Sequence, residues 1–369
     1  MSTPPQATGP SSAAQARSQL LPFLMGAYAL LIVNASLYPF SGWRAPAEGL
    51  WAYLASGWPR YLNTWEIPLN VAGYVPLGFA LALHFLRRHP WPWALSLATL
   101  AGTGLSFCLE SLQSYLPARI ASNLDLASNG AGAFIGAACG CFLDKAWSLR
   151  ERLHAFRSRR VPHGVTADFA ITLTLVWLFV QLNPELGFLG TADLGTLLGH
   201  EYGLPYSART YLLLETLQTT LNLAGIGAFL GILALSRRSW IGGAAILLGC
   251  GALLKALAGH ALLKTPQPWV WLTPSLAVGV LAGALLLGLW YSAGASMKTL
   301  GLSALLGACV LSWVVPVNPY LAIMVRPIAH GHVSSINGAT WWVAQLWPWM
   351  AMLCLLKLPQ ARHASARHP

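Results

Sequence analysis

The chain alternates between long apolar runs and short polar segments, many of which contain arginine. The first apolar run, from Leu20 to Phe40, has about the 20 residues that a helix needs to cross a bilayer. Further runs of similar length follow, so the pattern predicts ten membrane-crossing helices. They are expected at residues 20–40, 66–86, 91–115, 124–143, 167–183, 209–235, 239–262, 268–293, 297–316 and 338–357. The aromatic-rich segment 48–63 indicates an interfacial helix or a re-entrant piece.

Composition supports an all-α, polytopic transmembrane helical bundle. Hydrophobic residues make up 56% of the chain and charged residues only 9%, compared with roughly 25% charged in a soluble domain. The 17 tryptophans also fit, because tryptophan gathers at membrane–water interfaces. The formal charge of +11 resides in short loops and not in a basic domain, so no nucleic-acid partner is expected.

The basic residues predict the orientation of the helices. With a cytoplasmic N-terminus, 15 of the 22 lysines and arginines fall on the inner side and 6 on the outer side, while Lys255 lies within a helix. This positive-inside bias predicts that both termini are cytoplasmic. The longest basic stretch, 144–166, is interpreted either as a helix on the anionic inner leaflet or as a solvated linker.

Sequence similarity within the chain predicts a parallel internal repeat. The sequence of residues 69–73, LNVAG, recurs as LNLAG at residues 221–225. Helices one to four and five to eight would then be two copies, followed by a half-length third unit. The predicted domains are a disordered tail (1–19), a four-helix membrane domain (20–143), a basic cytoplasmic linker (144–166), a degenerate second repeat (167–293), a half-repeat (294–357) and a basic tail (358–369).

Six polar residues of the first copy are expected near the outer membrane boundary. They are Asn70, Glu110, Gln113, Arg119, Asp125 and Asn129. A charge within a bundle costs about 2.5–3.5 kcal/mol on insertion scales, so such residues need an explanation. Spacings of three and four residues place Glu110 with Gln113, and Asp125 with Asn129, on common helix faces. Ser122 or Asn123 is the expected N-cap of the fourth helix.

Two interpretations of this cluster remain open. It forms a pocket for a lipid headgroup or for catalysis, or it is a hydrogen-bonded clamp in which Arg119 neutralises Glu110 or Asp125. The corresponding residues of the second copy are Leu257, His260, Leu272 and Leu276. A clamp that stabilises the fold should be present in both copies, so the asymmetry favours function. In a catalytic version Glu110 or Asp125 would act as general acid/base and Arg119 would hold a phosphate.

The same residues carry a family resemblance. WEIPLNVAGYVPLGFALAL (65–83) and ESLQSYLPARIASNLDLASNGAGAFIG (110–136) resemble the VanZ-like membrane domain, which shows an Asn and Pro-x-Gly, then Glu-x-x-Gln, an Arg, and Asp-x-x-x-Asn-x-x-Gly. Here the pattern falls on Asn70, Pro76, Gly78, Glu110, Gln113, Arg119, Asp125, Asn129 and Gly132. The resemblance covers about residues 20–143. It implies a multi-pass protein of the bacterial inner membrane and cell envelope, in a family whose founding member is associated with teicoplanin resistance, and it supplies no established catalytic residues.

The leading hypothesis is a protein that binds or modifies a lipid-linked or cell-wall-related molecule at the outer leaflet. Its partner would be a membrane lipid or a lipid-linked envelope intermediate; protein partners are not predicted. A transporter or flippase, and a non-catalytic scaffold, are the alternatives, so enzymatic activity is left open. No cofactor or metal site is expected, because the six cysteines lack zinc-ligand spacing and His330-Gly331-His332 has no completing ligand. Lys255 and Glu215 are expected to form a buried ion pair.

Overall fold

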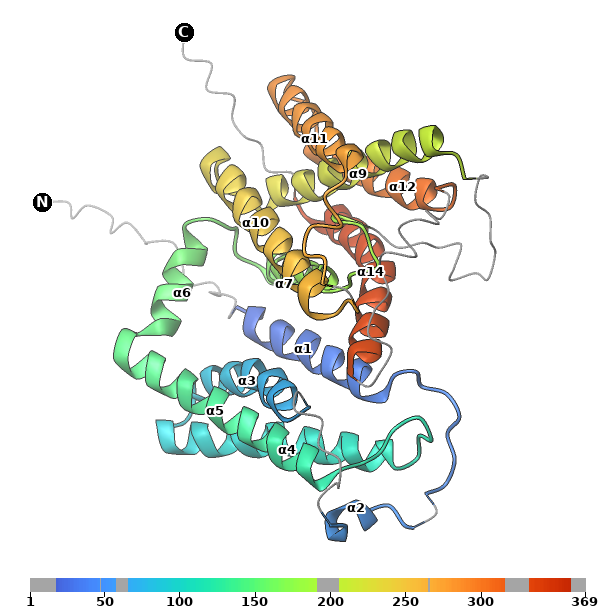
Figure 1. The fold of residues 1–369 in the computed structure, drawn as a ribbon. Coiled ribbons are helices and arrows are strands. Elements are labelled where there is room, and N and C mark those ends of the chain that lie inside the picture. Colours follow the sequence, from blue (N-terminus) through green and yellow to red (C-terminus); the bar gives the residue numbers. More distant parts are fainter. Residues whose placement is uncertain are drawn as a thin grey trace, which may run out of the picture.

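The computed structural model describes residues 18–46, 48–57, 66–190, 206–264, 266–315 and 332–359, with the side chains of 332–336 left aside. Every regular element of this part is a helix (Figure 1). The helices are α1 (Leu20–Leu37), α2 (Ala52–Ala55), α3 (Glu66–Phe85), α4 (Trp91–Gln113), α5 (Asn123–Trp147), α6 (Leu149–Ser158), α7 (Val165–Val180), α9 (Ala208–Leu233), α10 (Arg237–Ala261), α11 (Pro274–Ser292), α12 (Met297–Ser312) and α14 (His332–Lys357).

Each of the ten predicted helices is present. The largest differences lie at two starts. α11 begins at Pro274 and not at 268, because Thr273 caps the helix with its side chain and proline is tolerated at the first helical position. α14 begins at His332, six residues before the predicted start. The segment 48–63 contributes only the four-residue α2, and residues 58–63 lie outside the described part.

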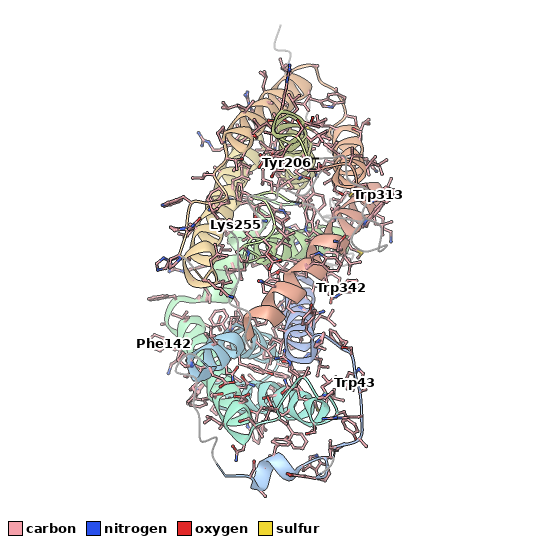
Figure 2. All side chains as sticks on the ribbon, turned by 45° about the vertical axis from the view of Figure 1, so that its right-hand side comes forward. Trp43, Phe142, Tyr206, Lys255, Trp313 and Trp342 are labelled. Carbon is pink, nitrogen blue, oxygen red and sulfur yellow. The ribbon has the colours of Figure 1, made fainter. Side chains whose placement is uncertain are left out.

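The chain is a multi-pass membrane protein. Among the described residues, eight helices are long and apolar enough to cross a membrane, and α7 and α12 are shorter apolar helices. Figure 2 shows Trp43, Trp313 and Trp342 along one edge of the molecule and Phe142 on the opposite side. The three tryptophans belong to segments predicted to be at or near the outer face, and Phe142 to the inner end of α5.

The first half packs through close contact between α3 and α5, with α4 against both. Gly132 and Gly136 of α5 make the contact possible, since an added Cβ would lie 2.3 Å from the Val71 carbonyl oxygen and 2.0 Å from that of Val75. Gly78 of α3 faces the backbone of Ala133 in the same way. Small residues that let two helix backbones approach are typical of membrane bundles.

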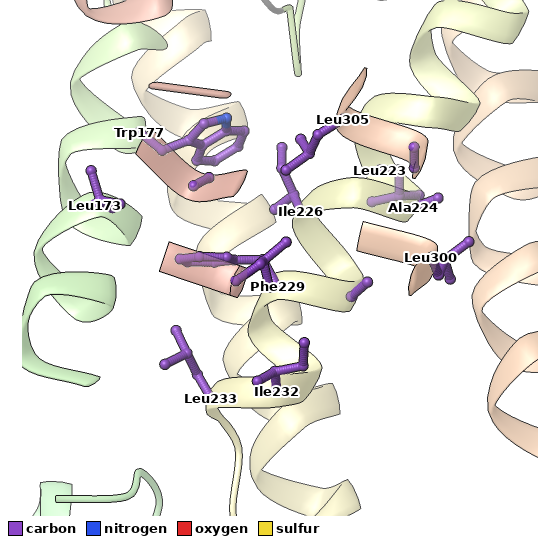
Figure 3. Packing of buried hydrophobic residues seen from close by; sticks show 14 of the residues in the cluster. Leu173, Trp177, Leu223, Ala224, Ile226, Phe229, Ile232, Leu233, Leu300 and Leu305 are labelled. Atoms are coloured by element: carbon purple, nitrogen blue, oxygen red, sulfur yellow. The ribbon is translucent and has the colours of Figure 1, made fainter. Parts of the chain in front are cut away.

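The second half has its own core around α9. Figure 3 shows Ile226 and Phe229 of α9 among side chains of α7 and α12, and all of these belong to one buried cluster. α9 also packs against α11, again through glycines: a Cβ at Gly279 would lie 2.7 Å from the Thr216 carbonyl oxygen. α14 completes this half by packing against α7 and α12.

Helix α1 joins the two halves. It packs against α3 and α4 on one side and against α7 and α14 on the other, and Figure 1 shows it between the two groups. At the predicted cytoplasmic end, the Arg157 side chain of α6 forms a buried ion pair with Asp168 of α7. Ser18 and Gln19, at the start of α1, donate hydrogen bonds to the same Asp168 carboxylate. This cluster ties together α1, α6 and α7.

Several predicted features fall outside the described residues. These are the disordered tail up to residue 17, most of the basic tail, and the His330-Gly331-His332 segment, of which only the backbone of His332 is described. The internal repeat stays a prediction. Its strongest structural support lies in the glycines of the fourth helix of each copy. Gly132 and Gly136 of α5 contact α3, and Gly279 and Gly283 of α11 contact α9.

Candidate functional site

The six predicted residues line one cavity of about 390 Å³. The cavity lies where α1, α3, the end of α4 and the start of α5 meet, at the end of the bundle that the basic-residue pattern places outside. Its described lining also contains apolar side chains, among them Leu31, Ile32 and Leu69. The structure therefore brings together all the residues that the sequence singled out.

Glu110 is the most deeply placed acid of the cavity, with 3% of its surface exposed. It lies in the last turn of α4, and its Oε2 accepts a hydrogen bond from the Ser122 backbone N–H at 2.9 Å. Ser122 is the N-cap of α5, where its Oγ accepts hydrogen bonds from the Leu124 and Asp125 backbone N–H groups. The predicted cap is thus confirmed, and Glu110 is held by the turn that joins α4 to α5.

Asp125 lies in the first turn of α5, where the positive end of the helix dipole favours a carboxylate. The Asn70 side-chain amide of α3 donates a hydrogen bond of 2.8 Å to Asp125 Oδ1. This bond joins two elements that are 55 residues apart in sequence. It fixes the position of the carboxylate on the cavity wall.

The two remaining amides also donate within the protein. Asn129, one turn beyond Asp125, donates a 2.9 Å hydrogen bond to Ser106 Oγ of α4. Its Oδ1 is buried and has no hydrogen-bond partner. Gln113 donates a 3.0 Å hydrogen bond to the Ser36 carbonyl oxygen of α1. A buried acceptor with no partner is costly, and its presence on a cavity wall is a feature of binding sites.

Arg119 connects the cavity to the end of α1. Its Nε donates to the Tyr38 carbonyl oxygen at 3.1 Å, and its Nη2 donates to that of Ala35 at 2.6 Å. Burial lowers the pKa of the Arg119 guanidinium, while the nearby Glu110 and Asp125 carboxylates raise it. A large part of the role of this arginine is therefore to hold the end of α1 against the α4–α5 turn.

The loops above the cavity are held by further hydrogen bonds. The Arg44 N–H donates to the Tyr115 carbonyl oxygen at 2.9 Å, and the Asn123 side chain donates to that of Ser56 at 2.7 Å. The Tyr53 hydroxyl of α2 lies 3.4 Å from Ser111 Oγ. Burial raises the pKa of Tyr53, the Ser111 hydrogen bond lowers it, and the Glu110 charge contributes a smaller rise.

Sequence analysis missed several lining residues, namely Tyr28, Glu66, Tyr74 and Phe179. The Tyr28 hydroxyl of α1 donates a 2.9 Å hydrogen bond to the Gly73 carbonyl oxygen of α3. Phe179 belongs to α7, so the second half supplies part of the wall. Glu66 was visible as an acid at a helix start, but no sequence pattern indicated that α1 and α7 would close this cavity.

In the described part of the second half, the positions that correspond to Glu110 and Asp125 are apolar, and polar residues gather instead around Lys255, as Asn183, Glu185 and Asn337. Leu257 and Leu272, which correspond to Glu110 and Asp125, are exposed on the surface of the bundle. The predicted ion pair of Lys255 with Glu215 is wrong. Lys255 donates to the carbonyl oxygens of Asn183 and Leu186, and Glu215 accepts a hydrogen bond from Thr273. The chain after α7 folds back over Lys255 and offers it backbone acceptors, which sequence spacing could not show.

Among the described residues, no group of three or more histidine, cysteine or acidic side chains is placed to hold a metal ion. Three acids, Glu66, Glu110 and Asp125, together with side-chain amides and an apolar wall, suit binding of an amphiphile. A buried carboxyl group can also take part in proton transfer when a substrate lies within hydrogen-bond reach.

The chain was compared with known proteins. Comparisons with curated proteins and with solved structures gave no match. The model of the VanZ/LLP1 family matches residues 9–144, a range that contains α1 to α4, most of α5 and every predicted site residue. The matched part supplies all of the described cavity lining except Phe179. Residues 9–144 of this membrane protein therefore form a VanZ-like domain, to which the remaining helices are added.

Proposed function

We propose that this cell-envelope protein binds or modifies a lipid-linked molecule in the cavity of its VanZ-like domain. The proposal includes a position in the bacterial cytoplasmic membrane with the cavity at the outer leaflet. The single observation that carries it is the meeting of Asn70, Glu110, Gln113, Arg119, Asp125 and Asn129 on one cavity wall beside apolar side chains. Charged groups within a bundle are expensive, and they gather where a ligand or a reaction uses them.

A comparison of the two halves distinguishes residues that stabilise the bundle from residues that the proposed function uses. A cation that binds the backbone near the end of a helix occurs in both halves, as the half-buried Arg119 beside α1 and as the buried Lys255 beyond α7. The second half also has amides and an acid near its cation, Asn183, Glu185 and Asn337, but it has leucines at the positions that correspond to Glu110, Asp125 and Asn129. Stabilisation of the bundle therefore explains the cations better than it explains Glu110, Asp125 and Asn129.

The proposal is tested with Glu110→Gln and Asp125→Asn in the full chain. Both replacements keep the side-chain shape and remove the charge. We expect lipid that co-purifies with the wild-type protein to be lost from both variants, while their levels in the membrane stay normal. Native mass spectrometry of the purified proteins measures the bound lipid, and immunoblotting of membranes measures their abundance.

Glu151→Gln, on the exposed face of α6, is the matched control and should retain the lipid. Unchanged lipid in both cavity variants would contradict the proposal. A loss of lipid that merely follows a loss of protein abundance would instead support the scaffold hypothesis.

A further inference from the structure

The described lining of the cavity has more negative than positive charge. Three of its residues are acids, Glu66, Glu110 and Asp125, and Arg119 is its one described cation. When all four are ionised, three carboxylates and one guanidinium leave a formal charge of −2. Arg119 also donates to the Ala35 and Tyr38 carbonyl oxygens, so part of its hydrogen-bonding capacity serves α1. This balance disfavours a phosphate and favours a cation.

Hydrogen bonding around the cavity also favours a cation over a phosphate. The side-chain amides of Asn70, Gln113 and Asn129 each donate one hydrogen bond within the protein, which takes part of the donor capacity of their NH2 groups. Asn129 is 7% exposed, and its Oδ1 is a buried acceptor without a partner. A ligand that donates hydrogen bonds would share the carboxylates, and it would satisfy this oxygen once the Asn129 amide turned toward the cavity. A ligand that only accepts would leave the oxygen unsatisfied, which costs about 1–3 kcal/mol.

The remaining walls suit a cation attached to an apolar chain. Tyr28, Tyr74 and Phe179 place three aromatic rings on the cavity, and aromatic faces attract ammonium groups. Leu69 and Ile120 also line it and are exposed, at 44% and 87%. An alkyl chain leaving the cavity past them would reach lipid without burying a polar group.

We propose that the cavity selects an amphiphile with a primary ammonium headgroup. The ammonium group supplies three donors, no acceptor and one positive charge. It would lie between Glu110, Asp125 and Asn129 Oδ1. This inference rests on the proposed function and narrows its ligand class from any lipid-linked molecule to a cationic one.

The test uses three amphiphiles with the same twelve-carbon chain: dodecylammonium, dodecyl maltoside and dodecyl phosphate. The full-length protein is purified in a neutral polyoxyethylene detergent, and the three probes compete for it in native mass spectrometry. We expect dodecylammonium to bind at least about tenfold more tightly than dodecyl phosphate, because charge-assisted hydrogen bonds contribute roughly 1.5–3 kcal/mol.

Variants show whether the binding occurs in the cavity. Gly73 lines the cavity, and a Cβ there meets nothing within 4 Å, so Gly73→Leu should fill the cavity and abolish binding of all three probes. Glu110→Gln, and separately Asn129→Leu, should reduce the preference for dodecylammonium over dodecyl phosphate severalfold. Glu151→Gln should leave it unchanged. The thermal unfolding profile of each variant identifies any that fails to fold. If Gly73→Leu fails to fold, Asn129→Leu provides the test of binding in the cavity.

The outcomes separate the two proposals. If the cavity variants reduce binding but the wild-type protein prefers dodecyl phosphate or dodecyl maltoside, the ammonium proposal is wrong and the proposed function still holds. Binding that no cavity variant changes, for all three probes, overturns both. Preference for dodecylammonium that is reduced by Glu110→Gln and by Asn129→Leu supports both.

Discussion

At the scale of single residues, the half-buried Arg119 and the buried Lys255 have related surroundings. Arg119 donates to carbonyl oxygens at the end of α1, next to Pro39, and Lys255 donates to those of Asn183 and Leu186 beyond α7, next to Pro184. A helix end leaves carbonyl groups without helical partners, and within a membrane protein those groups need a donor. Each cation supplies one.

Lys255→Met tests this stabilising role. Methionine keeps the apolar stem but leaves the Asn183 and Leu186 carbonyl oxygens without their donor. We expect the free energy of unfolding to fall by about 1–3 kcal/mol, the usual cost of a buried group left unsatisfied. Thermal unfolding in detergent measures the change. Lys264→Met, at an exposed lysine, is the control and should have almost no effect; equal stability of the two variants would disprove the role.

At the scale of the helices, glycine determines how closely α3 and α5 approach. Gly132 and Gly136 lie four residues apart on α5, and each faces a carbonyl oxygen of α3. The contact matters for the site, because Asn70 on α3 reaches Asp125 on α5 only if the helices stay this close. The packing of two helices thus positions the polar wall of the cavity.

Gly136→Ala should disturb this contact. The new Cβ would lie 2.0 Å from the Val75 carbonyl oxygen, so one helix must shift. Overpacking of this kind costs about 1–3 kcal/mol, and we expect a lower unfolding temperature together with weaker lipid retention. Gly104→Ala in α4 is the matched control, since a Cβ there meets nothing within 4 Å and alanine favours a helix. The idea fails if both variants unfold at the same temperature.

At the scale of the whole molecule, the VanZ-like domain and the added helices are joined at both ends of α1. At the end that the basic residues predict to be cytoplasmic, Arg157, Asp168 and Ser18 form the buried cluster described above. At the other end, Tyr38 packs against Gly338 of α14, where a Cβ would lie 2.3 Å from the tyrosine ring. Because Tyr38 also accepts a hydrogen bond from Arg119, the added helices support the cavity.

Asp168→Asn should weaken this junction. It leaves the buried Arg157 without its counter-charge, and breaking a buried pair costs about 3–5 kcal/mol. Asp144→Asn removes the carboxylate of a more exposed pair with Arg150, for which about 0–1 kcal/mol is expected. Thermal unfolding of both variants compares the two pairs. Similar losses in both would show that the Asp168 cluster does not hold the halves together.

Much of this architecture follows from local sequence patterns. The ten helices follow from apolar runs of the length that a bilayer requires. A cap of α5 at Ser122 or Asn123 follows from the preference of helix starts for small polar side chains, and the structure shows that it is Ser122. The depth of Glu110, Asp125 and Asn129 follows from their positions at the ends of α4 and α5. These features depend only on residues close together in the chain, and so a reader of the sequence can find them.

The tertiary structure alone decided which partners these residues meet. Lys255 binds backbone oxygens of a segment about 70 residues away and not Glu215, and Phe179 of α7 reaches a cavity otherwise built by the VanZ-like domain. The hydrogen-bonding character of the cavity also depends on the partners of its amides: Gln113 donates to Ser36 of α1, and Asn129 donates to Ser106 of α4. Such contacts arise from the packing of distant helices, and the spacing of residues along one helix contains no information about them.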